Sequence, residues 1–563
     1  MNSLHLTDYI VFLIYFLMVA GYGFWIYKKK KSATDSASRD YFLAEGSLTW
    51  WAIGTSLISS NISSEQFIAM SGSGFTMGLA IATYEWMAAL TLIIVAVYFI
   101  PVYLKNKIYT MPQFLHQRYN GDIAMIMAVF WLLLYVVVNL TSILYLGALA
   151  INGISGLNLD LCMYLLAIFA IVIALGGMKV IGYTAVIQVV FLILGGLVTT
   201  YLALNKVAEL NGGPGGVVNG FNYMMNQSGD HFHMIFDKEN KNYISLPGLS
   251  VLIGGMWIVN LNYWGCNQYI TQRALGADLK TAREGILFAA FLKLLIPIIV
   301  VLPGIAAYVI HQNGEFFQTE LLGPDGNLKP DLSYPVLLNL LPAGLKGLSF
   351  AALTAAVVAS LAGKINSIST IFTLDIFKKK IDVDASEKKL VYIGKVTVVV
   401  SMIIAVIIAP HLGIDKGGFQ FIQEYTGFVS PGIFAMFIMG FFWKKTSSNA
   451  AMFATIGGFA LSVLFKLLPG FVDLEFLHSV GYSVLVPQED GTSLYEIPFI
   501  DRMGIVFAIC VALMVIISYI DEKRGIKSKG LEIDSSMFKV NSTFLAGSLL
   551  IIGILVALYT VFW

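Results

Sequence analysis

Charged residues are scarce in this chain, and so are cysteines. Charged side chains make up 12% of its residues, against about 25% in an average soluble domain. The three cysteines, Cys162, Cys266 and Cys510, form no C-x-x-C pair, so neither a metal site nor a disulfide framework is indicated. No basic segment stands apart from the hydrophobic runs, which argues against nucleic-acid binding. The rest is apolar, with 57% hydrophobic residues and a mean hydropathy of +0.78, as expected of an integral membrane protein.

Long apolar runs are abundant. Because a membrane helix needs about 20 mostly apolar residues, we predict an all-α integral membrane protein with fourteen transmembrane helices. Lys28–Lys31 follow the first run directly, a stop-transfer pattern that predicts a retained helix and not a signal peptide. The predicted spans are 9–27, 47–72, 78–103, 123–151, 160–178, 181–205, 247–268, 285–310, 346–375, 390–410, 417–442, 448–468, 503–520 and 542–562.

Lysine and arginine gather in alternate loops. If the N-terminus is outside, the inner loops hold the basic clusters, such as Lys28–Lys31 and Lys378–Lys380, and the outer loops hold few basic residues. This pattern predicts a multi-pass protein of the cell (inner or plasma) membrane with both termini extracytoplasmic. The three long loops, 206–246, 311–345 and 469–502, then face outward. We interpret His231 and His233, in the first of them, as two solvated loop histidines.

Two opposite charges, Glu85 and Lys293, lie inside predicted spans. A charge at a helix centre costs roughly 3 kcal/mol even on the lenient insertion scale, so it normally faces a partner or a watery cavity. We therefore predict that the two side chains share one polar network at mid-membrane depth. Gln66, Asn260 and Gln423 lie in three other spans and are candidates to join it.

Two of the predicted spans are interrupted by polar or flexible residues. Residues 59–64, Ser-Ser-Asn-Ile-Ser-Ser, break the second span, and Gly254-Gly255 precede Asn260 in the seventh. Matched breaks in two halves of a membrane chain are typical of a transporter binding site, because freed carbonyls are tolerated only beside a cavity or an ion. The alternative is that the serines and asparagines simply bond neighbouring helices.

The candidate polar residues combine hydrogen-bond donors with acceptors and carry no net charge. No arginine lies within any predicted span, which disfavours a dicarboxylate ligand. A neutral ligand with many hydroxyl groups fits better, and nearby aromatic side chains suit the apolar faces of a sugar ring. No nucleophile–base pair or phosphate-binding loop is evident, so we do not expect an enzyme or a cofactor. The expected partners are a small sugar and the lipid bilayer, and no protein partner is indicated.

Four segments are more specific: NISSEQFIAMSGSGFTMGLAIATYEWM, GMWIVNLNYWGCNQYITQRAL, FLKLLIPIIVVLPGIAAYVI and FQFIQEYTGFVSPGI. They closely resemble the sodium/solute symporter family, with its bacterial sodium/galactose and animal sodium/glucose members. The resemblance implies a secondary transporter that moves a neutral monosaccharide by alternating access, coupled to sodium. It also implies two inverted five-helix repeats with broken first helices. The implied organisation is 1–46 (first helix and inner loop), 47–205 and 247–442 (the repeats), 206–246 (outer loop) and 443–563 (three further helices).

The resemblance also implies roles for individual residues. It assigns sugar contacts to Gln66, Glu85, Asn260, Lys293 and Gln423. It assigns an outer gate to Met70, Tyr84 and Phe419, and an inner gate to Tyr263. Ala88 stands where the bacterial galactose member has a serine that contacts the sugar, so a galactose preference is in doubt.

The implied sodium ligands are Ser59, Ile62, Ala356 and Ser360. Two family oxygens are missing, because Ala359 replaces a serine and Ala185 an aspartate. Lys364 follows Ser360 by four residues and shares its helix face. Its ammonium could stand in for the ion, which would give a proton-coupled or passive sugar carrier or a membrane sugar sensor. Alternatively, Lys364 extends toward the inner surface.

Overall fold

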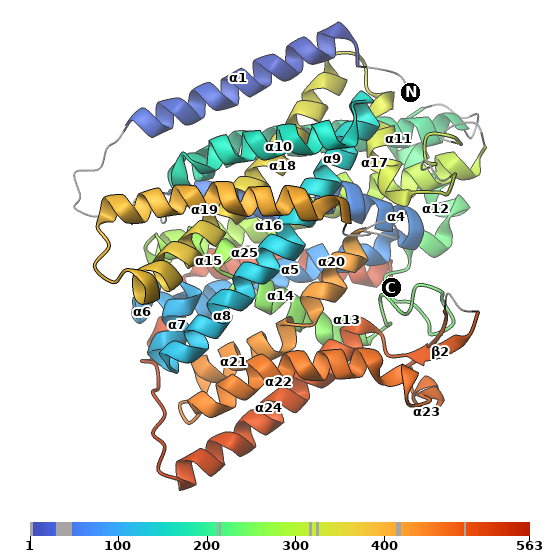
Figure 1. Ribbon diagram of the computed structural model, residues 1–563. Coiled ribbons are helices and arrows are strands. Elements are labelled where there is room, and N and C mark those ends of the chain that lie inside the picture. The colour runs from blue at the N-terminus through green and yellow to red at the C-terminus, as the bar shows by residue number, and fades with distance from the viewer. Residues whose placement is uncertain are drawn as a thin grey trace. The chain divides into compact units, whose positions relative to one another are not determined.

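The computed structural model describes residues 4–29, 48–210, 212, 215–314, 318–322, 326–411, 418–488 and 491–563. They are almost entirely helical, with one two-stranded hairpin (Figure 1). Among these residues, ten helices are long and apolar enough to cross a membrane, or eleven if one bent pair forms a single span. The predicted class of helical, multi-pass membrane protein is confirmed, and the number fourteen stays a prediction.

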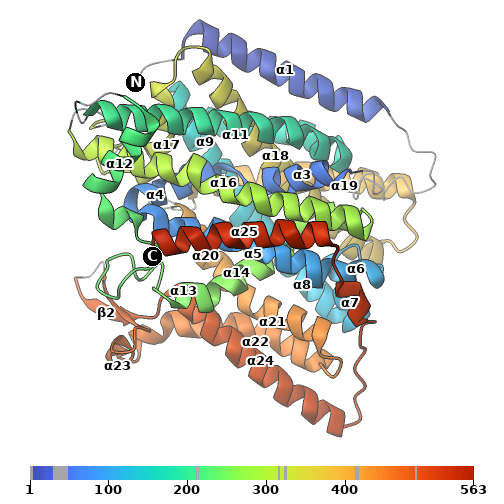
Figure 2. The same cartoon turned by 180° about the vertical axis from the view of Figure 1, so that it is seen from behind.

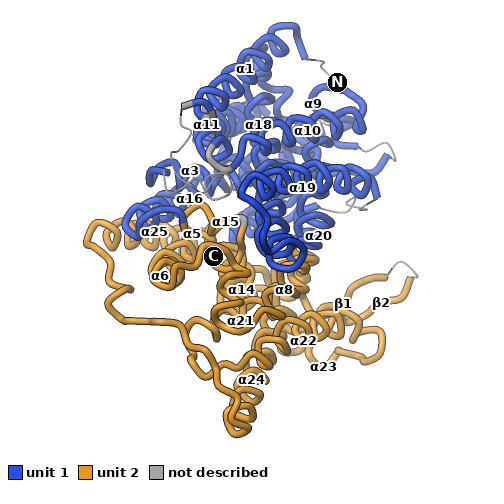
Figure 3. The backbone as a smooth tube through the Cα atoms, turned by 60° about the vertical axis from the view of Figure 1, so that its left-hand side comes forward, with its two compact units in different colours: residues 1–85, 131–233, 276–422 blue, residues 86–130, 234–275, 423–563 orange. Residues whose placement is uncertain are grey.

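The chain divides into two compact units, each drawn in its own colour in Figure 3. Unit 1 comprises residues 1–85, 131–233 and 276–422. In it, α16 packs against α3, α4 and α11 (Figure 2). Helix α18 packs against α1, α10 and α11. Its helices are α1 (Leu6–Lys29), α3 (Trp50–Asn61), α4 (Ser71–Met77), α9 (Thr141–Ser155), α10 (Leu159–Ala174), α11 (Gly177–Leu210), α12 (Val217–Gln227), α16 (Leu279–Gln312), α17 (Ser333–Leu337), α18 (Leu345–Thr370) and α19 (Glu387–Ile408).

Unit 2 comprises residues 86–130, 234–275 and 423–563. Here α21, α22 and α24 pack against one another, and α14 contacts both α21 and α24. Its helices are α6 (Ile100–Lys105), α7 (Met111–Arg118), α13 (Ser250–Ile253), α14 (Gly255–Gly265), α15 (Gln268–Leu275), α21 (Ser430–Phe442), α22 (Ser448–Leu467), α23 (Glu475–His478), α24 (Phe499–Lys523) and α25 (Ser542–Val561). Three helices run across a unit boundary: α5 (Thr83–Ile94), α8 (Gly121–Leu133) and α20 (Gly418–Gly427).

The predicted spans that miss the length criterion are short or interrupted. The second begins as the 12-residue α3, and the fifth is the 16-residue α10. The seventh splits at Gly254 into α13 and α14, and the eleventh is the pair α20 and α21, bent by 51°. A tight turn at Gly176–Gly177 separates α10 from α11, and Gly177 has a positive φ of 78° there.

The connection 469–502 contains the hairpin, a small departure from the helical prediction. Strand β1 (Val484–Pro487) pairs antiparallel with β2 (Ser493–Glu496), with Val484 opposite Glu496. Half-buried and exposed residues alternate along β1, as expected for a strand with one face covered. The run is too short to stand out in a window wide enough to detect a membrane helix.

The interpretation of His231 as a solvated loop histidine is wrong, whereas His233 is exposed. The His231 ring stacks on Tyr308 with centroids 4.0 Å apart, and its Nε2 lies 3.1 Å from the carbonyl oxygen of Phe75. The backbone of His231 also packs against Gly78, where an added Cβ would come within 2.2 Å of its carbonyl oxygen. This part of the 206–246 loop is therefore seated on the end of α4 and its continuation. Within the described residues, no cluster of metal-binding side chains is present.

Asp331 joins three segments of unit 1. It lies in a 3₁₀ turn (Pro330–Leu332) between α16 and α18, and is 8% exposed. Its Oδ2 accepts a hydrogen bond from the Gly418 N–H, 3.1 Å away at the start of α20. Its Oδ1 and backbone approach α4 so closely that only glycine fits at Gly72. Burial raises the pKa of Asp331 to about 7, although the Gly418 N–H and the charge of Lys329 lower it.

This raised pKa predicts a pH-dependent stability. Between about pH 4 and pH 7 the folded protein holds a proton on Asp331 that the unfolded chain has released, so the free energy of unfolding falls as the pH rises and then levels off. Asp331→Asn keeps an acceptor for Gly418 and removes the titration. We expect the variant's melting temperature to decline less over this pH range. Parallel melting-temperature curves for the two proteins would refute the assignment.

Candidate functional site

The second predicted span breaks where the serine- and asparagine-rich segment predicts it. Helix α3 ends at Asn61, and Ile62 is extended, with φ −75° and ψ 103°. The next N–H, of Ser63, donates 3.0 Å to the side-chain oxygen of Gln66 and so leaves the helical pattern. The chain then resumes as a π-helical segment, Glu65–Met70. Because the last carbonyls of a helix lack intrahelical partners, acceptors gather at this break.

Glu85 and Lys293 form an ion pair, as predicted. The ammonium of Lys293, in α16, donates hydrogen bonds to the Glu85 carboxylate in α5 and to the amide oxygen of Asn61 at the end of α3. The Lys293 and Glu85 side chains are 1% and 4% exposed. Each charge is therefore matched inside unit 1, as burial in a low-dielectric interior requires.

This cluster has the chemistry to bind hydroxyl groups. A carboxylate only accepts hydrogen bonds, an ammonium only donates them, and an amide does both. Glu85, Lys293 and Asn61 thus offer both kinds at one point with no net charge. Asn61 was recognised in the sequence only as part of the break. Its position on the last turn before Ile62 is the signal that could have placed it here.

The other predicted sugar residues are distributed over both units. In unit 1, Gln66 is buried, and its Oε1 is held by the Ser63 N–H. In unit 2, Asn260 is 5% exposed and donates 3.2 Å to the Met256 carbonyl of its own helix. Gln423 is half-buried in α20. All five assignments to a sugar remain predictions.

Two of the predicted gate residues are in contact. The rings of Tyr84 and Phe419 meet edge to face with centroids 4.9 Å apart, a favourable aromatic geometry. Met70, in the same unit, is completely buried. The predicted inner gate, Tyr263, belongs to unit 2 and packs edge-on against Trp264 at 5.1 Å. The gating roles themselves stay predictions.

The predicted sodium ligands lie together in unit 1. Ser360, on α18, donates from its hydroxyl to the Ser60 carbonyl at 3.3 Å, which brings α18 against the break in α3. The Ser59 hydroxyl is buried, and no described residue accepts or donates a hydrogen bond to it. Ile62 and Ala356 are buried as well. A buried hydroxyl without a described partner, next to the carbonyls at a helix end, fits a cation that prefers oxygen ligands.

Lys364 does not extend to the inner surface. It is 3% exposed, its Nζ donates 3.2 Å to the side-chain oxygen of Asn139, and the same atom lies 4.9 Å from the centre of the Tyr135 ring. The charge of Lys364 also acts electrostatically on Glu65, the first residue of the π-helical segment after the break. Ala359 and Ala185, which stand where the resemblance implies oxygen ligands, are buried. Asn139, which the sequence analysis missed, is a single amide in the apolar run 123–151.

The Sodium:solute symporter family matches residues 41–458 of the chain. The chain belongs to this family. It is therefore a membrane transporter, in agreement with the expectation that it is not an enzyme. It is 44% identical to a sodium/glucose cotransporter of Vibrio parahaemolyticus, over 100% of this chain and 99% of that protein. It is 34% identical to sodium/myo-inositol cotransporter 2 of Homo sapiens, over 83% and 70% of the two chains.

Solved structures show the same fold. The outward-open structure of a Na⁺-coupled sialic acid symporter superposes with a TM-score of 0.74 and 21% sequence identity, covering 92% of this chain and 98% of that one. Mhp1, a nucleobase-cation-symport-1 family transporter, gives a TM-score of 0.52 at 13% identity, covering 87% and 96%. The predicted fold type, that of sodium-coupled symporters with broken helices, agrees with both.

The buried ion pair gives a prediction about stability. Lys293→Met leaves the Glu85 charge uncompensated, which typically costs about 3–5 kcal/mol, whereas Glu85→Gln combined with Lys293→Met removes both charges. We expect the single variant to melt far below the wild type and the double variant to recover most of the loss. The matched control is Lys389→Met, which breaks an exposed pair with Asp382 and should cost about 1 kcal/mol or less. Equal losses for Lys293→Met and Lys389→Met would contradict the prediction.

Proposed function

We propose that this protein imports a neutral monosaccharide or a closely related polyol by sodium-driven alternating access across the cell membrane. The observation that carries this proposal is the buried cluster of Lys293, Glu85 and Asn61 at the break in α3. A buried charge pair of this kind is stable only when its bonding capacity is satisfied. A ligand with several hydroxyl groups can form hydrogen bonds with this cluster without adding charge.

The relatives support the same class of ligand. The Vibrio parahaemolyticus protein is named for glucose and the human protein for myo-inositol, and both compounds are neutral rings rich in hydroxyl groups. We assign the hydrogen bonding of the ligand to Gln66, Glu85, Asn260, Lys293 and Gln423. Ala88 offers no hydroxyl, which favours a glucose-like or inositol-like ligand over galactose.

The same proposal extends to the organisation of the chain. Residues 47–205 and 247–442 form the two inverted repeats, and 443–563 adds three helices. Met70, Tyr84 and Phe419 close the ligand from one side and Tyr263 from the other. The contact between Tyr84 and Phe419 supports the first of these gates.

Removing single amides tests the ligand assignment. Gln423→Ala and Asn260→Ala each leave a ligand hydroxyl without its partner, a loss of about 1–3 kcal/mol. We expect each variant to raise the dissociation constant for glucose or myo-inositol at least several-fold, measured by calorimetry on purified protein. Gln312→Ala, at the exposed end of α16, should leave it unchanged. Unaltered affinity in both site variants would refute the assignment.

A second candidate function is sugar transport, or sugar sensing, without sodium. It is favoured by Lys364, which is buried one helical turn from Ser360, and by the missing oxygens at Ala359 and Ala185. Two like charges about 4 Å apart repel by roughly 4 kcal/mol at an effective dielectric of 20. A lysine that turned toward Ser360 would therefore exclude the ion and replace its charge. In the structure, however, the Lys364 ammonium donates to Asn139 on a different helical segment. This hydrogen bond supports sodium coupling, because it directs the ammonium to Asn139.

Uptake into proteoliposomes separates the two candidates. If Asn139 holds Lys364 away, wild-type sugar uptake depends on sodium, because Ser360 and the carbonyls at the break suffice as ligands. If Lys364 replaces the ion, uptake ignores sodium and becomes sodium-dependent in the variant with Ala359→Ser, Ala185→Asp and Lys364→Met. The measurement is initial sugar uptake as a function of sodium concentration for both proteins. Sodium-independent uptake by both would contradict any role for this cluster.

A further inference from the structure

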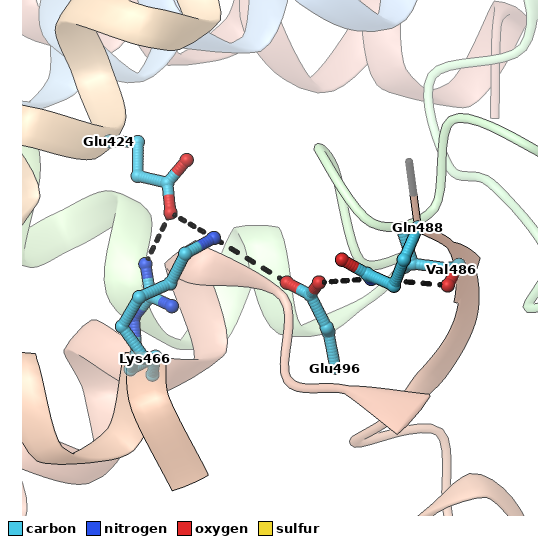
Figure 4. A network of polar contacts seen from close by, with 6 residues as sticks. Glu424, Lys466, Val486, Gln488 and Glu496 are labelled. Carbon is cyan, nitrogen blue, oxygen red and sulfur yellow. Dashed lines mark hydrogen bonds and ion pairs between the residues drawn. The ribbon is translucent and has the colours of Figure 1, made fainter. Parts of the chain in front are cut away.

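A cluster of charged residues in unit 2 binds the carboxylate of Glu424, the residue next to Gln423. The carboxylate of Glu424, in α20, accepts from the Arg502 guanidinium at 2.8 Å and from the Lys466 ammonium at 3.0 Å. Lys466, near the end of α22, also reaches Glu496 on β2 at 3.4 Å, so its ammonium lies between two carboxylates (Figure 4). The side-chain amide of Gln488 extends this network by donating a 3.0 Å hydrogen bond to the Glu496 carboxylate.

Arg502 is the most deeply buried member of this cluster. The thirteenth predicted span begins at residue 503, whereas α24 begins at Phe499 and includes Arg502, whose side chain is 6% exposed. Its guanidinium also lies 5.3 Å from the centre of the Phe428 ring. Phe428 follows the last residue of α20, at the bend to α21. Arg502 therefore contacts α20 at Glu424 and at its terminal bend.

We propose that Arg502 and Lys466, acting through Glu424, are positioning residues that fix the rotation of α20 and thereby the direction of Gln423. The inference rests on the proposed role of Gln423 in ligand binding. Neighbouring residues of an α-helix point about 100° apart, so Gln423 and Glu424 project in different directions from α20. A helix held at Glu424 and again at Phe428 cannot turn about its axis without breaking a charge-assisted hydrogen bond.

The two cations contribute unequally. Arg502 is desolvated, while Lys466 is 40% exposed and divides its charge between Glu424 and Glu496. Exposed pairs are typically worth about 0–1 kcal/mol, whereas a buried guanidinium that loses its partner is costly. Arg502 is therefore the main clamp. Lys466 adds a weaker tie between α20 and the hairpin in the 469–502 connection.

The transport experiment compares Glu424→Gln and Arg502→Gln with the wild type in proteoliposomes at equal amounts of folded protein. Loss of a charge-assisted hydrogen bond at this position should raise the KM for sugar about fivefold or more, with Vmax changed less than about twofold. The half-saturating sodium concentration should not move. The matched control, Glu522→Gln, breaks an exposed pair with Lys445 of similar length, 3.0 Å, and should leave KM unchanged.

A second readout needs no substrate. The three native cysteines are buried, so a Gln423→Cys variant reports its own reaction with a water-soluble thiosulfonate. Adding Glu424→Gln should change that reaction rate, and exchanging the charges with Glu424→Arg and Arg502→Glu should restore it. An unchanged rate overturns the positioning role, whatever happens to KM. If the wild type moves no sugar, the proposed function fails while the thiol rate still decides this inference.

Discussion

An uncompensated charge cannot be kept inside this protein, and most of the site follows from that constraint. Lys293 lies in a 34-residue apolar helix and is 1% exposed, so its ammonium must be matched from other segments. Glu85 supplies the charge and Asn61 supplies an amide oxygen. The match draws α16, α5 and the broken end of α3 to one point, and the polar site forms where these three segments meet.

The break in α3 makes this arrangement possible. A continuous helix would bond its own carbonyls, whereas the Ser63 N–H turns to Gln66 and leaves the last turn of α3 with acceptors available. α18 uses one of them, because the Ser360 hydroxyl bonds to Ser60. Asn61, the amide partner of Lys293, and the candidate cation ligands Ser59 and Ile62 therefore lie in one short segment. That proximity is a physical route by which binding of one solute can influence binding of the other.

The polar site could be predicted from the sequence because a charged residue in an apolar run is evident from the hydropathy. The sequence indicated the Glu85–Lys293 pair and the interrupted second span. It could not identify the partners of Lys364 or Arg502, because the choice of Asn139 and Glu424 depends on contacts between segments far apart in the chain. It could not predict the packing of His231 for the same reason, because a polar loop sequence does not indicate that the loop packs on the ring of Tyr308. Short, bent helices also fall below any length criterion, so the number of spans stays a prediction.

The environment of Asp331 has one more consequence. Because burial raises the pKa of this carboxyl to about 7, its charge changes within the neutral range of pH. The change adds or removes one unit of charge where the start of α20, α4 and the connection from α16 meet. Two samples of identical sequence whose pH differs across this range therefore differ in charge at the joint between these segments.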